Sequence, residues 1–322
     1  MTNSARLLAL ISAFSFGAAH ADAPRVVTDI PPTFGIVARV MEGVGTPDLI
    51  LQSAVSAHDY ALRPSEALMI ERAEVVFWIG HDMTPWLGHS LETLGASAIS
   101  VELLDTDGTN LLPFRENHIF EGDIDRDDHD DHDEHDEHDE HDGHDKHGHG
   151  SINPHAWLNP ENAKMWAQHI AEILAERDPD NAETYRANAD DLVSEIQETI
   201  ENIQQAFGSA PMQEMLVYHD AYGYFEAQFN IPVSGAITDG HAARPGPQRL
   251  QSIADLINEH DIGCILIEPQ TDPDAINNTF SGIDLRQVVI DPIGTRLEHN
   301  SRLYPALLQS VAQSFQNCAQ GG

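Results

Sequence analysis

Apolar residues in this chain gather in short continuous runs that alternate with amphipathic stretches. Four strand-like runs precede residue 121 and four follow residue 210; they cover residues 25–30, 49–52, 75–79, 98–104, 215–218, 231–237, 264–268 and 288–291. Unbroken apolar strands separated by helical segments are typical of parallel sheets covered on both faces. The pattern therefore predicts an α/β fold with two lobes, each with a parallel β-sheet flanked by helices.

A long helical pattern lies between the two sets of strands. Asp178-Pro179 is a helix start signal, apolar residues recur at helical spacing as far as Phe207, and Gly208 is a stop signal. At 1.5 Å per residue the helix would be a rod of about 43 Å. We expect residues 178–208 to join an N-terminal lobe of residues 22–177 to a C-terminal lobe of residues 209–322, with a cleft between the lobes.

The first 21 residues, MTNSARLLALISAFSFGAAHA, have the features of a secretory signal peptide. They contain one Arg, an apolar run and the small-x-small sequence Ala19-His20-Ala21. No later segment approaches the ~18 consecutive apolar residues of a membrane span. We expect a mature protein that begins near Asp22, is soluble and periplasmic, and does not insert into the membrane.

The formal net charge of the 322 residues is −37. This charge argues against nucleic-acid binding, which requires a basic surface, and against docking on anionic lipid. It favours a cationic ligand.

Residues 121–149 contain fifteen Asp and Glu and almost no apolar side chains. Such a segment cannot bury enough surface to offset its ordering entropy, and we expect a disordered loop. It also contains eight histidines: His129, His132, His135, His138, His141, His144, His147 and His149. A solvated acidic linker would not explain these histidines, and we expect them to gather divalent metal weakly because no spacing fixes one coordination geometry.

Candidate ligands for a tighter site lie where strands end, which is where open parallel sheets bind ligands. His58 follows the second apolar run, His219 directly follows residues 215–218, and Asp291 follows Val289-Ile290. His155 lies in the Pro- and Asn-rich sequence NPHAWLNP, which indicates an ordered turn. Three imidazoles and one carboxylate would form a tetrahedral zinc site.

Each of these histidines could instead be an ordinary surface or core residue. The other histidines outside the acidic run lack this placement and are expected to be structural or solvent-exposed, with His241 the best candidate for an exception; they are His81, His89, His118, His169, His241, His260 and His299.

Only two cysteines occur, Cys264 and Cys318. In an exported protein they favour a disulfide that would stabilise the second half of the chain. The alternative is that Cys264, within the apolar sequence CILI, is a small core residue.

Five sequence motifs occur in order: AHDYALRPSE, NPHAWLNPENA, VYHDAYGYFE, EPQ and VVIDPIGT, with an acidic His-rich insertion between the first two. In this arrangement the chain resembles the periplasmic zinc-binding receptors of ABC importers (the ZnuA family). The resemblance implies two lobes bridged by a long helix, Zn²⁺ held in the cleft, and delivery of zinc to a membrane permease.

By position, the resemblance implies that His58, His155 and His219 are ligands and that Asp291 supplies the fourth. It also matches Cys264 and Cys318 to a cysteine pair that is bridged in some zinc receptors. Some relatives have Glu immediately before the first ligand, where this chain has Ala57. That difference excludes a Glu ligand at this position and favours Asp291.

Three neutral imidazoles favour Zn²⁺ over Mn²⁺, whereas Cu²⁺ would bind at least as strongly by intrinsic order. We therefore expect a monomeric high-affinity zinc receptor that is not an enzyme and that works with an ABC permease. A periplasmic zinc buffer or storage protein is the alternative. A secreted zinc hydrolase is disfavoured because the chain has no HExxH motif, and Glu268 is the one strand-end carboxylate suited to be a general base.

Overall fold

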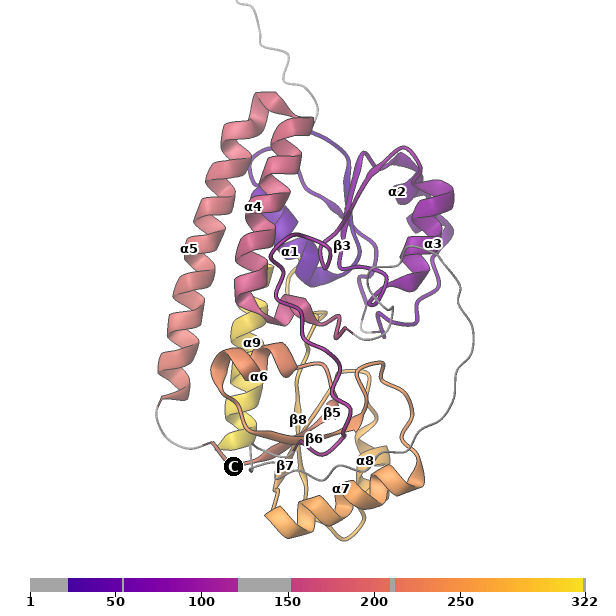
Figure 1. Ribbon diagram of the computed structural model, residues 1–322, viewed down its shortest axis with the longest axis vertical. Coiled ribbons are helices and arrows are strands. Elements are labelled where there is room, and N and C mark those ends of the chain that lie inside the picture. The colour runs from indigo at the N-terminus through magenta and orange to yellow at the C-terminus, as the bar shows by residue number, and fades with distance from the viewer. Residues whose placement is uncertain (1–22, 54, 121–151, 209–211, 321–322) are drawn as a thin grey trace, which may run out of the picture.

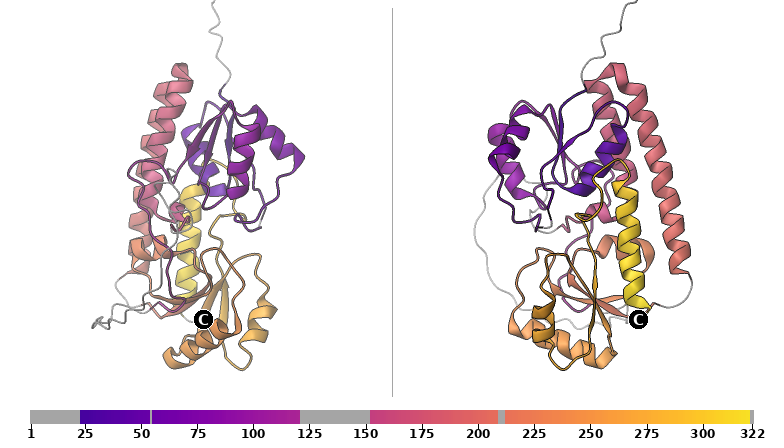
Figure 2. Two further views of the ribbon diagram at one scale, coloured as in Figure 1. Left: turned by 45° about the vertical axis from the view of Figure 1, so that its right-hand side comes forward. Right: turned by 180° about the vertical axis from the view of Figure 1, so that it is seen from behind.

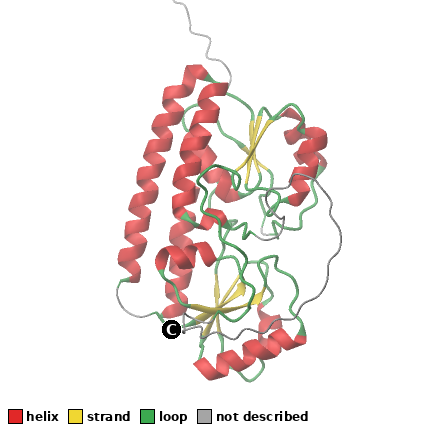
Figure 3. Cartoon of the chain, viewed as in Figure 1, coloured by secondary structure: helices red, strands yellow, loops and turns green. Residues whose placement is uncertain are grey.

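The computed structural model describes residues 23–53, 55–120, 152–208 and 212–320. The eight predicted strands are present and form two separate four-stranded sheets (Figure 3). The first sheet has the order β2-β1-β3-β4 and contains β1 (Val26–Thr28), β2 (Asp48–Leu49), β3 (Val75–Trp78) and β4 (Ile99–Glu102). The second has the order β6-β5-β7-β8 and contains β5 (Met215–His219), β6 (Val233–Thr238), β7 (Cys264–Ile267) and β8 (Arg286–Val289).

All strand pairs in both sheets are parallel, as predicted. In each sheet the first strand lies between the second and the third, so that the chain reverses its direction across the sheet at that point. Ligands of open parallel sheets bind beyond the carboxyl ends of strands at such a switch point. His219 ends β5 and Glu268 follows β7, so both lie at the switch point of the second sheet.

Proline marks the beginning of many of the helices that connect these strands. Pro is the first residue of α1 (Pro31–Val40), α2 (Pro64–Arg72), α3 (Pro85–Leu94), α4 (Pro160–Arg177), α7 (Pro247–His260) and α8 (Pro273–Thr279). Pro is favoured there because its missing N–H would have no partner inside the helix. The short helix α6 (Gly223–Phe229) follows β5.

The predicted long helix is α5 (Ala182–Phe207), preceded by the 3₁₀ turn η2 (Pro179–Asn181) and followed by Gly208, which adopts a positive φ of 63°. Helix α5 runs beside α4 and extends along both sheets (Figure 1). The final helix, α9 (Leu303–Ala319), contacts α1 and α5 as well as β7 and β8. The two sheets are therefore linked by α9 in addition to the predicted long helix (Figure 2).

One apolar core passes through both lobes. It includes Phe77 of β3, Ile196 of α5, Val217 of β5 and Phe315 of α9, all buried. Because these side chains pack continuously, the core fixes the two sheets relative to each other in this conformation.

The segment before residue 121 crosses from the first sheet to the second. Ile119 pairs antiparallel with Gly235 of β6, and the Phe120 N–H donates to the Ser234 carbonyl over 2.8 Å. Residues 118–120 thus cover the free edge of β6. The predicted lobe boundaries remain a prediction, and this segment lies on the second sheet although its sequence position is in the first lobe.

Candidate metal centre

Three of the four predicted ligands meet between the two sheets. His58 lies in the loop after β2, His155 in the turn before the 3₁₀ helix η1 (Ala156–Leu158), and His219 at the end of β5. One ring nitrogen from each lies within 4.8 Å of the other two. Nitrogens on a tetrahedral zinc ion at 2.0–2.1 Å are about 3.3 Å apart, so small side-chain movements would close this group on an ion.

The ring centres confirm this convergence. They are 5.4 Å apart for His58 and His155, 5.9 Å for His58 and His219, and 4.9 Å for His155 and His219. His155 and His219 are buried, with 1% and 5% of their surface exposed, and His58 is half-buried.

Asn153 determines which nitrogen of His155 is available. Its side-chain oxygen accepts from the His155 backbone N–H over 3.1 Å and lies 2.7 Å from His155 Nδ1. Because this oxygen is an acceptor, Nδ1 carries the hydrogen and Nε2 presents its lone pair. Nε2 is buried without a hydrogen-bond partner among the described residues, as is Nε2 of His58. Buried polar atoms normally have a hydrogen-bond partner, so two buried ring nitrogens without one are suited to bind a metal ion.

Glu268 orients the third ring. Its Oε1 lies 2.9 Å from His219 Nδ1, and its other oxygen accepts a hydrogen bond from Gln270. On the other side of the ring, His219 Nε2 donates to the Gly240 carbonyl over 3.1 Å. A carboxylate on the second nitrogen is the usual arrangement around a metal-binding histidine.

Burial keeps two of the rings neutral. Burial and the neighbouring His219 and His241 rings lower the pKa of His58 to about 4. Burial likewise lowers the pKa of His155 well below its ordinary value. For His219, burial opposes the charged form, but Glu268 and the Gly240 carbonyl raise its pKa overall. Neutral imidazole is the form that binds metal.

A cavity of about 350 Å³ contains the three rings, and its walls also include Asp291, Glu268 and His241. Asp291 does not join the group of converging nitrogens. Both of its oxygens are engaged in its own turn: one accepts from the Gly294 N–H, and the other from the Thr295 hydroxyl and the Arg296 N–H. Asp291 as the fourth ligand therefore remains a prediction; its Oδ1, which accepts one hydrogen bond, keeps a lone pair that could bind a metal.

Two neighbours of the site carry weaker sequence signals. Asn153 precedes His155 by two residues, and the turn-forming NPH sequence indicated an ordered turn but not the side-chain contact. Glu268 stands out in the sequence as a strand-end carboxylate, and the structure places it against His219. This contact depends on the pairing of β5 with β7, which the sequence does not specify.

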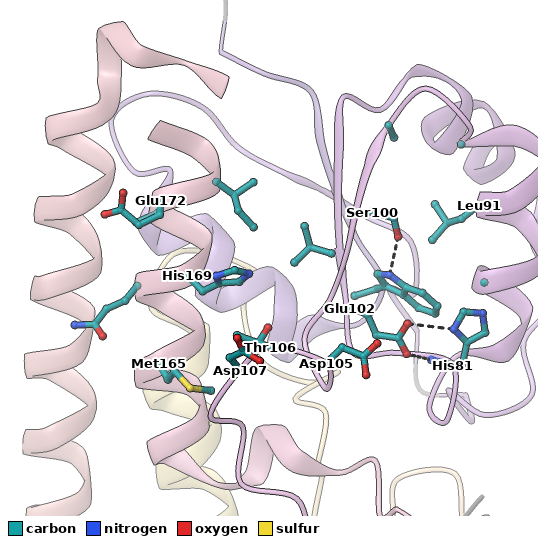
Figure 4. A pocket seen from close by; sticks show the side chains of 18 of the residues that line it. His81, Leu91, Ser100, Glu102, Asp105, Thr106, Asp107, Met165, His169 and Glu172 are labelled. Atoms are coloured by element: carbon teal, nitrogen blue, oxygen red, sulfur yellow. Dashed lines mark hydrogen bonds and ion pairs between the residues drawn. The ribbon is translucent and has the colours of Figure 1, made fainter. Parts of the chain in front are cut away.

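A larger hollow of about 1260 Å³ lies elsewhere, between β4 and α4. Figure 4 shows His81 beside Glu102 on one wall and His169 on α4 at the opposite wall. His81 Nδ1 lies 3.1 Å from Glu102 Oε2. Within the described ranges, three converging metal-binding side chains occur only at the His58, His155 and His219 group.

Of the remaining predicted sites, the disulfide lies within the described residues and the others lie outside them. Cys264 and Cys318 form a disulfide that joins the start of β7 to α9, as predicted. The eight histidines of the acidic run and residues 1–21 lie outside the described residues, so the weak metal sites and the signal peptide remain predictions. No described helix is long and apolar enough to cross a membrane.

An arginine ties the crossing segment to the residues around His219. Arg115 donates to Asp220, which follows His219, and to both oxygens of Glu226 over 2.8 and 2.9 Å. Its guanidinium also lies 3.6 Å from the Phe120 ring centre. The side chains of Asp220 and Glu226 are nearly buried, and Arg115 supplies the one positive charge that both of them contact.

Comparison with known proteins shows the family of this chain and agrees with its fold. A family model described as zinc-uptake complex component A, periplasmic (ZnuA), matches residues 26–318. The chain is 39% identical over 307 residues to the high-affinity zinc uptake system protein ZnuA of Brucella abortus, with 91% of each chain covered. It is also 39% identical over 303 residues to the protein of the same description from Paracoccus denitrificans, with 93% of each covered.

A solved structure described as a crystal structure of ZnuA has the same fold. The TM-score is 0.74 at 22% sequence identity, and the match covers 93% of this chain and all of the other. The prediction of two parallel-sheet lobes joined by a long helix is confirmed by this similarity.

Proposed function

The chain belongs to the family of periplasmic zinc-uptake components (ZnuA), and from this premise we propose that it captures Zn²⁺ between its two lobes and delivers it to the permease of an ABC importer. The ligands are His58, His155 and His219. The observation that carries this assignment is the convergence of three ring nitrogens, two of them buried without a partner.

The donor set supports zinc as the cargo. Three neutral imidazoles suit a borderline cation, and the absence of thiolates disfavours a soft ion such as Cu⁺. Asp291 is the fourth ligand in this proposal, through the lone pair that its hydrogen bonds to residues 294–296 leave free. The chain acts as a monomer in the periplasm and has no catalytic activity of its own.

Residues 121–149 have a separate role in this proposal. Their histidines bind metal weakly and raise the local concentration of zinc, as tethering does for any linked pair of sites. A buffer or storage protein would instead keep most of its zinc in that run.

Single substitutions test the ligand set. Replacing His58, His155 or His219 by Ala should weaken zinc binding by more than the roughly 10–100-fold that follows loss of an orienting partner, because a metal bond is lost. Calorimetric titration with Zn²⁺ is the measurement. A variant that binds zinc as tightly as the unmodified chain would remove that residue from the site.

Asp291→Ala tests the fourth position. Zinc should bind more weakly, and its X-ray absorption edge should change as water replaces the carboxylate. Unchanged affinity together with an unchanged edge would assign the fourth position to another group.

A further inference from the structure

A fourth histidine stands at the mouth of the zinc cavity. His241 is exposed, lines the same cavity, and lies with its ring centre 6.2 Å from that of His58. Rings that share one zinc ion have centres roughly 5–6 Å apart, because each nitrogen lies at 2.0–2.1 Å from the metal. His58 and His241 could therefore hold one ion after a small movement of either ring.

The four rings form an outer pair, His58 and His241, and an inner pair, His155 and His219. The inner rings are held by neighbours, His155 by Asn153 and His219 by Glu268. Across the described ranges, no hydrogen bond reaches the rings of His58 or His241 from another residue. An orienting hydrogen-bond partner fixes a ligand for tight binding, so the outer rings are held by ring packing alone, His241 against Phe114 with ring centres 4.4 Å apart.

The turn of residues 239–243, which carries His241, also contacts the inner ring of His219. Asp239 Oδ1 accepts from the backbone N–H groups of His241 and Ala243, each over 3.0 Å, and thus shapes the turn. Ala242 in this turn has a left-handed φ of 57°, a conformation that is unfavourable for alanine. The Gly240 carbonyl accepts the hydrogen bond from His219 Nε2. A displacement of residues 239–243 would therefore free the inner nitrogen.

We propose that His241 and His58 form a transient two-imidazole site for incoming Zn²⁺, from which the ion passes to His155 and His219 while it stays bound to His58. Movement of the turn with the captured ion withdraws the Gly240 carbonyl from His219. This inference rests on the proposed function, since it requires the inner site to be the destination of the ion.

A transient site has a kinetic signature that a permanent ligand lacks. It lowers the barrier between solvent and the inner site in both directions, so its loss slows association and dissociation by the same factor. The dissociation constant stays unchanged. Loss of a permanent ligand would instead weaken equilibrium binding.

Stopped-flow mixing of the metal-free full chain with Zn²⁺ alone, and of the zinc-loaded chain with a chelator, tests this. Trp157, whose ring centre is 5.2 Å from that of His155, is a built-in fluorescent reporter. In His241→Ala both rates should fall by about 10-fold, which corresponds to a barrier about 1.4 kcal/mol higher. His241→Gln, which keeps a polar side chain, should behave in the same way.

His89→Ala is the matched control, because this exposed histidine does not line the cavity and its replacement should leave both rates unchanged. Unchanged rates in His241→Ala would overturn the proposal, and so would faster dissociation with unchanged association, which would make His241 a permanent ligand. Failure of the proposed function is distinct: the unmodified chain itself would then give no tight zinc phase.

Discussion

Arg115 Nη2 lies 2.6 Å from Asp220 Oδ1, and Asp220 directly follows His219 in the chain. The contact joins the segment that crosses between the sheets to the turn that carries a predicted zinc ligand. Tyr224 reinforces the same junction, since its hydroxyl donates to the Asn153 carbonyl over 2.7 Å. The turns of His155 and His219 are thus held by one connected set of residues.

Arg115→Ala should destabilise the fold and weaken zinc binding. Removal of the guanidinium leaves the buried carboxylates of Asp220 and Glu226 without a partner, which costs about 3 kcal/mol of unfolding free energy. Displacement of the His219 turn should reduce zinc affinity by roughly 10-fold, as for loss of an orienting residue. Urea denaturation and zinc titration measure the two effects.

Arg39→Ala is the control for this variant. Arg39 is also largely buried and contacts Glu42, Asp191 and Glu195, but it joins α1 to α5 away from the cavity. The Arg39→Ala variant should therefore be less stable than the unmodified chain and bind zinc with the same affinity. Equal losses of zinc affinity in both variants would mean that Arg115 acts through global stability alone.

Glu268→Gln should weaken zinc binding by about 10–100-fold, because the carboxylate that orients His219 and strengthens it as a ligand is neutralised. The chain offers a matched control in Glu214, which lies 3.0 Å from His260 Nδ1 on the surface. Glu214→Gln alters the same type of pair without touching the cavity. Isothermal titration should separate the two variants, and similar affinities would argue against an orienting role for Glu268.

We expect Asp29 to make the free energy of unfolding depend on pH. It directly follows β1 at the switch point of the first sheet and accepts hydrogen bonds from the Ile30 and Ile79 backbone N–H groups. Burial nevertheless raises its pKa to about 6 from 3.8. The folded state therefore binds the proton more tightly than the unfolded state does, and this contribution is complete below about pH 4 and lost as the pH rises through about 6.

Two pKa units correspond to about 3 kcal/mol of unfolding free energy. Asp29→Asn, which resembles the protonated form, should remove this part of the pH dependence. Denaturation midpoints at pH 4.5 and 7.5 check the effect, with other groups titrating equally in both proteins. An identical pH profile for the variant and the unmodified chain would contradict the expectation.

The disulfide should stabilise the second lobe without affecting the zinc site. Cys264 and Cys318 are separated by 54 residues, and closing a loop of this length contributes roughly 4 kcal/mol in the chain-entropy model. Thiol counting on the denatured, unreduced protein should find none free. Reduction should lower the melting temperature and leave zinc affinity unchanged; a loss of zinc binding would place the bridge in the site.

The strands and the three histidines were predictable for a physical reason. Continuous apolar runs such as Val75–Trp78 are buried on both faces in the structure, so burial is encoded directly in residue type. His219 and His155 lie where a strand ends and where prolines fix a turn. Both features are local in the sequence.

Contacts between distant segments were not predictable in this way. The hydrogen bonds that occupy Asp291 come from the fold of residues 294–296, and no property of Asp291 alone indicates them. The crossing of residues 118–120 onto β6 and the span of α9 across both lobes depend on tertiary packing. His241 approaches His58 because a turn of the second lobe faces a loop of the first.

We propose that the tight zinc site is the His58, His155 and His219 group and that residues 121–149 hold only weak sites. The most direct measurement is a competitive zinc titration of the metal-free protein lacking residues 121–149, beside the full chain with His155→Ala. The deletion variant should keep one tight zinc equivalent and lose the weaker ones, whereas His155→Ala should lose the tight equivalent and keep the weaker ones. Loss of the tight equivalent in the deletion variant would contradict this assignment and place the tight site in the acidic run.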